Sequence, residues 1–128
     1  MRRRVKRNDA SWRNEVLTLH GPVCASCGDT QHVQADHVWP RSQGGPSHVL
    51  NGLPLCGEFS RNTRGGCHVA KTESRMLIQF EWLLPEQVAW LAEVGWVRWD
   101  EQGQPTGRGW RHFAPRTVPG VRLKGGAG

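Results

Sequence analysis

Apolar residues recur at helical spacing early in the chain and predict a helix over residues 12–19. Val16 and Leu17 fall on the side that would face a core, and Asp9 or Ser11 stands ahead of the segment as a helix cap. A glycine and a proline follow directly and would end this helix.

The next part of the chain alternates apolar and polar residues in two short segments, which predicts two β-strands. A strand over residues 32–38 runs into the loop PRSQGGPS, which is rich in turn residues, and residues 50–55 return from it. We therefore expect a broad β-hairpin. A polar loop follows, and residues 67–78 have the pattern of a second helix.

The C-terminal part predicts a helix and a second hairpin. Pro85 stands at the favoured first position of a helix over residues 85–93. Residues 96–99 alternate like a strand, a turn follows, and residues 109–113 would pair back.

Five of the seven tryptophans lie between residues 82 and 110. They could form an aromatic platform on which nucleic-acid bases stack. Their spacing instead follows the apolar faces of the expected helix and hairpin, so we favour a core of this region. That core would contain Trp82, Trp90, Trp96 and Trp99.

Composition sets the scale of the fold. The chain has 128 residues, of which 37% are apolar, with 16 glycines and 8 prolines. This fits one small α+β domain with tails, whose modest core needs a staple beyond hydrophobic burial. The apolar stretches are too short for a transmembrane helix, and the basic start leads into polar residues, unlike a signal peptide. We expect a cytoplasmic protein without a membrane partner.

Positive charge is concentrated at the two ends. Residues 2–7 carry five basic groups and residues 108–128 five more, while all 11 acidic residues lie between these segments. Basic arms around a less basic body favour a polyanionic partner through counterion release. The alternative is that short basic tails only aid solubility.

The four cysteines indicate a metal site. Cys24 and Cys27 form a C-x2-C knuckle, and Cys56 and Cys67 follow with ten residues between them. In a chain without a signal peptide, such a set is more typical of a structural zinc site than of disulfides. Two disulfides remain the alternative.

Five ordered sub-motifs resemble one known family. The chain contains them in four segments, CASCG, ADHVWPRSQGG, NGLPLC and CHVAKT; the second segment holds two sub-motifs, and an asparagine starts the third. Together they resemble the HNH endonucleases, whose ββα-metal fold is built around a zinc knuckle, over residues 24–72. The resemblance implies a small ββα-metal (HNH) core with a four-cysteine zinc site, an N-terminal helix and a C-terminal helix–hairpin extension.

One feature departs from the family pattern. The second knuckle is normally C-x2-C, whereas about eight extra residues within GEFSRNTRGG separate Cys56 from Cys67 here. The flanking motifs still match, so we interpret these residues as an insertion at the knuckle tip.

The resemblance assigns roles to four residues. His37 matches the general base that activates water, a task suited to an imidazole. Asp36 and His68 match the ligands of a catalytic Mg2+ or Mn2+, and Asn51 matches the residue whose amide holds the hairpin loop. Alternatively, His68 replaces one thiolate, which would give a zinc site of three cysteines and one histidine.

DNA is the expected substrate. No element for reading bases is evident, so the resemblance implies a monomer that nicks DNA with weak sequence preference. Basic residues around the site would contact the DNA backbone, although each could be only a solubilising charge. These residues are Arg41, Arg61, Arg64 and Lys71.

The expected organisation is a basic arm (1–10), an HNH nuclease domain (11–75), a Trp-rich extension packed on it (76–113) and a basic Gly/Pro-rich tail (114–128). The extension resembles that of small HNH proteins of actinobacterial phages. This resemblance implies the cytoplasm of an infected host as the location, and the phage terminase as a partner in genome packaging. The rival hypothesis is a zinc-stapled nucleic-acid-binding or packaging adaptor module without turnover.

Overall fold

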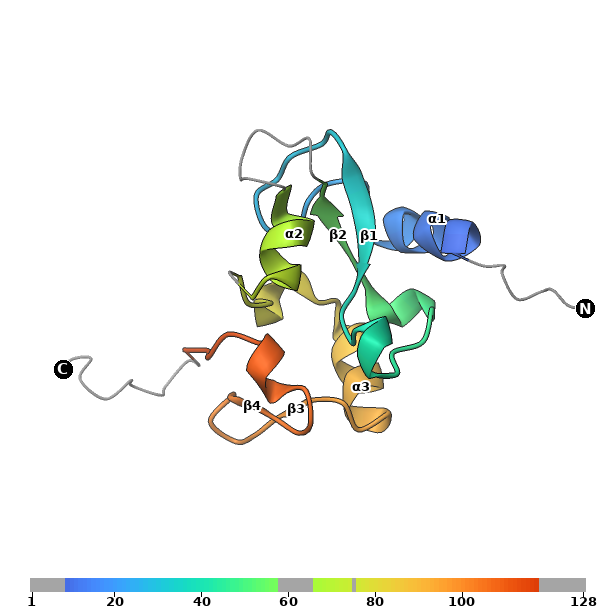
Figure 1. Cartoon of the computed structure of the whole chain (residues 1–128). Helices are drawn as coiled ribbons and strands as arrows, with labels where there is room; N and C mark the ends of the chain where they lie inside the picture. The colour runs from blue at the N-terminus through green and yellow to red at the C-terminus, as the bar shows by residue number, and fades with distance from the viewer. Residues whose placement is uncertain (1–8, 58–65, 75, 118–128) are drawn as a thin grey trace, which may run out of the picture. The chain divides into compact units, whose positions relative to one another are not determined.

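The computed structural model describes residues 9–57, 66–74 and 76–117. The chain divides into two compact units, residues 1–76 and 77–128, so the division falls one residue after the predicted one. Within the described residues there are three α-helices and two small antiparallel sheets, which confirms the α+β class (Figure 1). None of the helices in this part of the chain has the length and apolarity needed to cross a bilayer.

The first unit contains a β-hairpin between two helices. Strands β1 (Val33–His37) and β2 (Gly52–Cys56) pair antiparallel, from Val33 opposite Cys56 to His37 opposite Gly52. Helices α1 (Asp9–His20) and α2 (Gly66–Thr72) lie on different sides of this hairpin (Figure 1). From β1 onward, the elements follow the order strand, strand, helix.

The core of the first unit is small and is continuous with the cysteines. Every residue of β2 is buried. Leu55 packs with Cys24, Cys56 and Cys67, and Ala25 and Met76 cover this group. The remaining buried apolar side chains are Trp12, Val16, Val38, Leu53 and Ala70.

Both helices of the first unit differ in length from the predictions. α1 begins at Asp9, so Ser11 lies inside the helix and the prediction that it caps the helix is wrong. α2 ends at Thr72 instead of continuing to residue 78. The Thr72 hydroxyl donates to the carbonyl of His68, and Ser74 takes a left-handed φ of 63°. These local bonds and this turn end the helix early.

In the second unit the predicted helix is confirmed, whereas the predicted second strand of the hairpin is wrong. α3 spans Pro85–Glu93, as expected. However, β3 (Arg98–Trp99) pairs with β4 (Pro105–Thr106), and not with residues 109–113. The Asp100 carboxylate accepts hydrogen bonds from the backbone of Gln102 and Gln104, which closes a tighter turn than the sequence pattern indicated.

The tryptophans of the second unit contribute unequally to its core. Trp96 is buried beside Val97, whereas Trp82, Trp90 and Trp99 are half-buried. Trp99 meets Phe80 and Phe113 edge-to-face, with ring centroids 5.1 and 5.4 Å apart. The expectation of a Trp core therefore holds fully only for Trp96. Trp110, outside that expected core, is half-exposed.

Candidate metal and catalytic site

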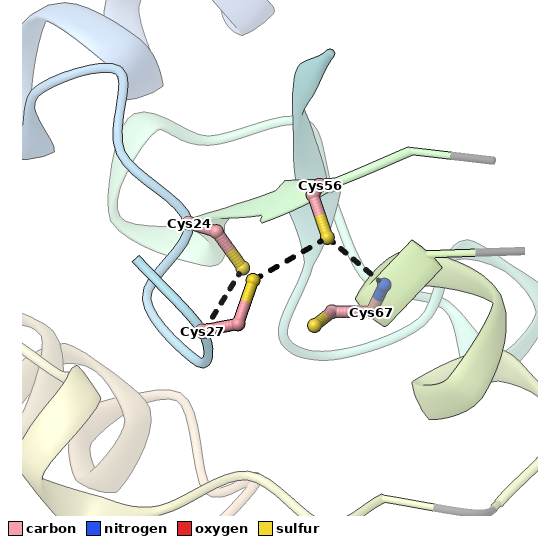
Figure 2. Close-up of side chains that lie close together, drawn as sticks. All are labelled: Cys24, Cys27, Cys56 and Cys67. Atoms are coloured by element: carbon pink, nitrogen blue, oxygen red, sulfur yellow. Dashed lines mark hydrogen bonds between the residues drawn. The ribbon is translucent and has the colours of Figure 1, made fainter. Parts of the chain in front are cut away.

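The four cysteines come together at one end of the hairpin. Their Sγ atoms all lie within 4.8 Å of one another (Figure 2). The Sγ atoms of Cys27 and Cys56 are 3.7 Å apart. Two thiolates on a tetrahedral zinc ion, with Zn–S bonds of about 2.3 Å, would be about 3.8 Å apart. The cluster therefore has the size and donor set of a structural metal site, and its four cysteines are thiols rather than disulfides.

The backbone around the cysteines holds the sulfurs in place. The amide of Cys27 donates to Cys24 Sγ at 3.5 Å, and the amide of Cys67 donates to Cys56 Sγ at 3.2 Å (Figure 2). Gly28 turns the first knuckle with a φ of 81° and bonds back to the carbonyl of Cys24. Such N–H donors stabilise negative charge on sulfur, as a metal-bound thiolate requires.

The thiols differ in acidity. Burial works to raise the pKa of Cys24, but hydrogen bonds from the backbone of Cys27, Cys56 and Ser26 outweigh it and hold the pKa below its usual value. Burial raises the pKa of Cys67. Burial likewise raises the pKa of Cys27, and the neighbouring thiols of Cys24 and Cys56 add to this effect. Crowded sulfurs resist carrying several charges together, and a bound cation relieves that repulsion.

The extra residues between Cys56 and Cys67 leave the cluster intact. A side chain on Gly66 would collide with the carbonyl of Gly57, so the two ends of the inserted segment lie against each other. Gly66 has a φ of 81°, a conformation that favours glycine. Cys67 therefore reaches Cys56 despite the long separation in sequence.

Asp36 and His68 are brought together by β1 and α2. The Nδ1 atom of His68 donates to Oδ1 of Asp36 at 2.9 Å. The other carboxylate oxygen, Oδ2, lies 2.9 Å from Nζ of Lys71, as an ion pair rather than an aligned hydrogen bond. The Asp36 side chain is 9% exposed and that of His68 is 37% exposed, so the pair opens to solvent on the histidine side.

Mutual contact shifts the acidity of this pair. Burial works to raise the pKa of Asp36, but the hydrogen bond with His68 and the charge of Lys71 outweigh it and lower the pKa. The hydrogen bond with Asp36 raises the pKa of His68, against the effect of burial. Asp36 is therefore a carboxylate that is held ionised.

Asp36 and His68 could hold a divalent cation once the His68 Nδ1 proton, which bonds to Asp36, is displaced. Ligands on adjacent corners of an octahedron with bonds of about 2.1 Å would be about 3.0 Å apart. The two atoms lie 2.9 Å apart, and a cation held by two protein groups keeps positions for water and phosphate oxygens. The arrangement differs from the alternative zinc site of three cysteines and His68. All four sulfurs lie in one cluster, and His68 forms a hydrogen bond with Asp36 instead.

His37 contacts the opposite helix. Its imidazole stacks on the indole of Trp12 in α1, with ring centroids 4.0 Å apart and planes 19° apart. Its Nε2 atom lies 3.3 Å from Oγ of Ser47 in the hairpin loop. His37 is half-buried and ends β1, where the hairpin opens into its loop.

Asn51 ties the hairpin loop together. Its Nδ2 donates to the carbonyls of Trp39 and Pro46, at 3.0 and 2.8 Å, and its Oδ1 accepts from the amide of Trp39 at 2.7 Å. The residue is fully buried, and these three bonds all go to the backbone of the loop. Its amide therefore holds the loop that follows His37.

The residues expected to bind DNA have different surroundings. Arg41 is exposed in a short 3-10 turn of the hairpin loop. The Lys71 side chain is 11% exposed and directed at Asp36, so it is part of the candidate site. Arg61 and Arg64 lie outside the described residues.

Two contacts of the site were not predicted from the sequence. The sequence indicated neither the stack of Trp12 on His37 nor the approach of Ser47 to the same imidazole. Both connect segments through the tertiary fold, and no motif spacing signals them.

Comparison with protein-family models, curated proteins and solved structures finds no match for this chain.

Proposed function

We propose that this chain is a metal-dependent DNA endonuclease of the HNH type, which nicks the phosphodiester backbone with weak sequence preference. One observation carries the proposal: Asp36 and His68, which are 32 residues apart in sequence, lie 2.9 Å apart. Asp36 directly precedes His37 on β1. The strand–strand–helix order and the four-cysteine cluster beside it support an HNH core stapled by Zn2+.

Asp36 and His68 would hold the proposed catalytic cation, Mg2+ or Mn2+. When bound, it would neutralise charge on the scissile phosphate and assist the departing oxygen. Asp36 is suited to the task because its carboxylate stays ionised beside His68 and Lys71. The ammonium of Lys71, 2.9 Å from this carboxylate, adds a second positive charge near the phosphate.

His37 is the proposed general base. It accepts a proton from the attacking water while that water approaches phosphorus. Asn51 fixes the loop directly after His37 and so keeps the imidazole in place without contacting the cation. Its role is to position the base.

DNA binding relies on positive charge at the ends of the chain and in the hairpin loop. The arms carry ten basic groups, and Arg41 is exposed on the loop beside the site. Phosphate contacts of this kind supply affinity without reading sequence. A single site cuts one strand, so the proposed product is a nick made by a monomer. We also propose that a phage encodes this chain and that the phage terminase is its partner.

The rival function is a zinc-stapled DNA-binding or packaging adaptor module without turnover. One observation favours it: both carboxylate oxygens of Asp36 already lie 2.9 Å from a nitrogen, His68 Nδ1 or Lys71 Nζ. If this arrangement excludes a cation, the fold and the DNA affinity remain and catalysis is lost.

Nicking of supercoiled plasmid by wild type and His37→Ala, with EDTA and with added Mg2+ or Mn2+, tests the proposal. Loss of a general base costs on the order of 100- to 10,000-fold in rate, while DNA binding persists. His32→Asn is the matched control, because His32 is part of none of the matched motifs and its φ of 57° suits asparagine.

The expected result is metal-dependent nicking by wild type and His32→Asn and almost none by His37→Ala. Binding by all three proteins with nicking by none would favour the adaptor module. Equal nicking by wild type and His37→Ala would overturn the mechanism.

A further inference from the structure

Helix α1 packs onto the hairpin directly over one residue pair of the sheet, His37 and Gly52. A Cβ atom on Gly52 would collide with the Val16 side chain and lie 3.1 Å from the ring of Trp12. Gly52 thus leaves the space that Val16 and Trp12 occupy. The helix lies so close to the hairpin that Trp12 reaches across Gly52 to the partner residue, His37.

Trp12 is fixed by two contacts besides its burial. Its indole face stacks on the imidazole of His37, with centroids 4.0 Å apart. Its Nε1 donates to the carbonyl of His48 at 2.7 Å, and the side chain is 5% exposed. Because the hydrogen bond prevents the indole from turning in its plane, the stacked imidazole rests on a rigid surface.

The stack and the loop constrain His37 from different directions. Trp12 contacts the face of the imidazole, and Ser47 approaches its edge at Nε2. Ser47 and His48 are consecutive loop residues, and Trp12 bonds to the second of them. One indole therefore connects both ends of the loop, His37 at its start and His48 near its end.

We propose that Trp12 is a positioning residue for His37, which sets the plane of the imidazole and so the direction in which its nitrogens accept a proton. The inference rests on the proposed function. A general base must be held within hydrogen-bond reach of the water, and a misplacement of about 1 Å can cost about 100-fold in rate. Apolar burial alone would not require a flat, hydrogen-bonded ring facing the imidazole.

Three variants separate positioning from packing. Trp12→Phe keeps an aromatic face, Trp12→Met fills the space with a flexible chain, and Val16→Ala weakens the same helix contact without removing a ring. We expect Trp12→Met to lower kcat for nicking about 10- to 100-fold with KM within about twofold, whereas Val16→Ala stays within about threefold of wild type. Trp12→Phe should fall between them, because it keeps the ring face and loses the hydrogen bond to His48.

A double-variant cycle tests whether the effect passes through His37. In a His37→Ala background, Trp12→Met should cause no further loss of kcat, because the residue that it positions is gone. An equal loss in both backgrounds would mean that Trp12 acts only on the fold, and would overturn the positioning role.

A spectroscopic test is independent of catalysis. In the wild-type protein, ring protons of His37 above the indole should be displaced upfield in NMR spectra, and Trp12→Met should remove this displacement. The His37→Ala spectrum identifies the signal. A wild-type His37 signal without upfield displacement overturns the proposal.

The outcomes distinguish this inference from the function on which it rests. If the wild-type protein does not nick DNA, the proposed nuclease function is wrong, and the stack of Trp12 on His37 has no catalytic role. Nicking by wild type with an unchanged kcat in Trp12→Met overturns only the role of Trp12.

Discussion

Asp36 and His37 are consecutive residues of β1, and their side chains contact different helices: Asp36 bonds to His68 of α2, whereas His37 stacks on Trp12 of α1. The pleat of a strand imposes this divergence, because successive side chains point to opposite faces. The two groups therefore flank the end of the strand. In the proposed mechanism, a phosphate bound there has the base on one side and the cation ligands on the other.

We expect the purified protein to contain about one zinc ion per chain, because four thiols converge within 4.8 Å. Folding should depend on this ion, so Cys24→Ser should lose both zinc and secondary structure. Elemental analysis and circular dichroism measure the two effects. Ser26→Ala is the control, since it alters the same knuckle without removing a thiol. A metal-free, reduced protein that stays folded would contradict the prediction.

Lys71→Met should strengthen binding of Mn2+ to the zinc-loaded protein by about tenfold or more, which is about 1.4 kcal/mol. The substitution removes a positive charge 2.9 Å from the carboxylate that we assign to the cation. Lys71→Arg keeps the charge and should leave the affinity near that of wild type. Titration calorimetry measures both. Equal Mn2+ affinity in Lys71→Met and wild type would mean that the ion does not bind at Asp36.

Asn51→Ala should lower the free energy of unfolding by about 2–4 kcal/mol, because three buried hydrogen bonds are lost and loop backbone groups lose their partners. Asn51→Asp should be at least as damaging, since an oxygen would replace Nδ2 opposite two carbonyls. Urea unfolding of the zinc-loaded protein measures the loss. The control is Asn14→Ala on the exposed surface of α1. Equal midpoints for the Asn51 and Asn14 variants would refute the role of this amide.

Replacing the five basic residues of segment 2–7 with glutamine should weaken DNA binding and flatten its salt dependence. Each lost phosphate contact reduces the steepness of the plot of log affinity against log salt by about 0.9, so five lost contacts should change it by up to about 4.5. Lysine at the arginine positions keeps the charge and should preserve the slope. Fluorescence anisotropy at several salt concentrations provides the measurement. An unchanged slope would show that the arm does not contact DNA.

The convergence of the four cysteines was predictable because their chemistry is contained in the residue type and their order in the motif. The hydrogen bonds of Asn51 to the loop are implied by the resemblance to HNH endonucleases and not by local pattern. The pair of Asp36 and His68 also follows from motif order. Their assignment as cation ligands stays a prediction.

Other features depend on contacts that local pattern does not encode. The early end of α2 results from the left-handed backbone of Ser74, and an apolar pattern continuing beyond it suggested a longer helix. The partner of β3 is set by Asp100, whose carboxylate accepts two amide hydrogen bonds. The stack of Trp12 on His37 requires α1 to dock over Gly52, a tertiary event.

The contact between Gly57 and Gly66 has a consequence for how such a chain can change in evolution. Because the backbones of Gly57 and Gly66 are in contact, the chain leaves the first unit and re-enters it at one point. Each doubling of a flexible loop costs only about 0.6 kcal/mol in closure entropy. We therefore expect codons gained or lost between these two glycines to leave Cys56 and Cys67 in place, and a foreign peptide grafted there to leave the thiols on either side undisturbed.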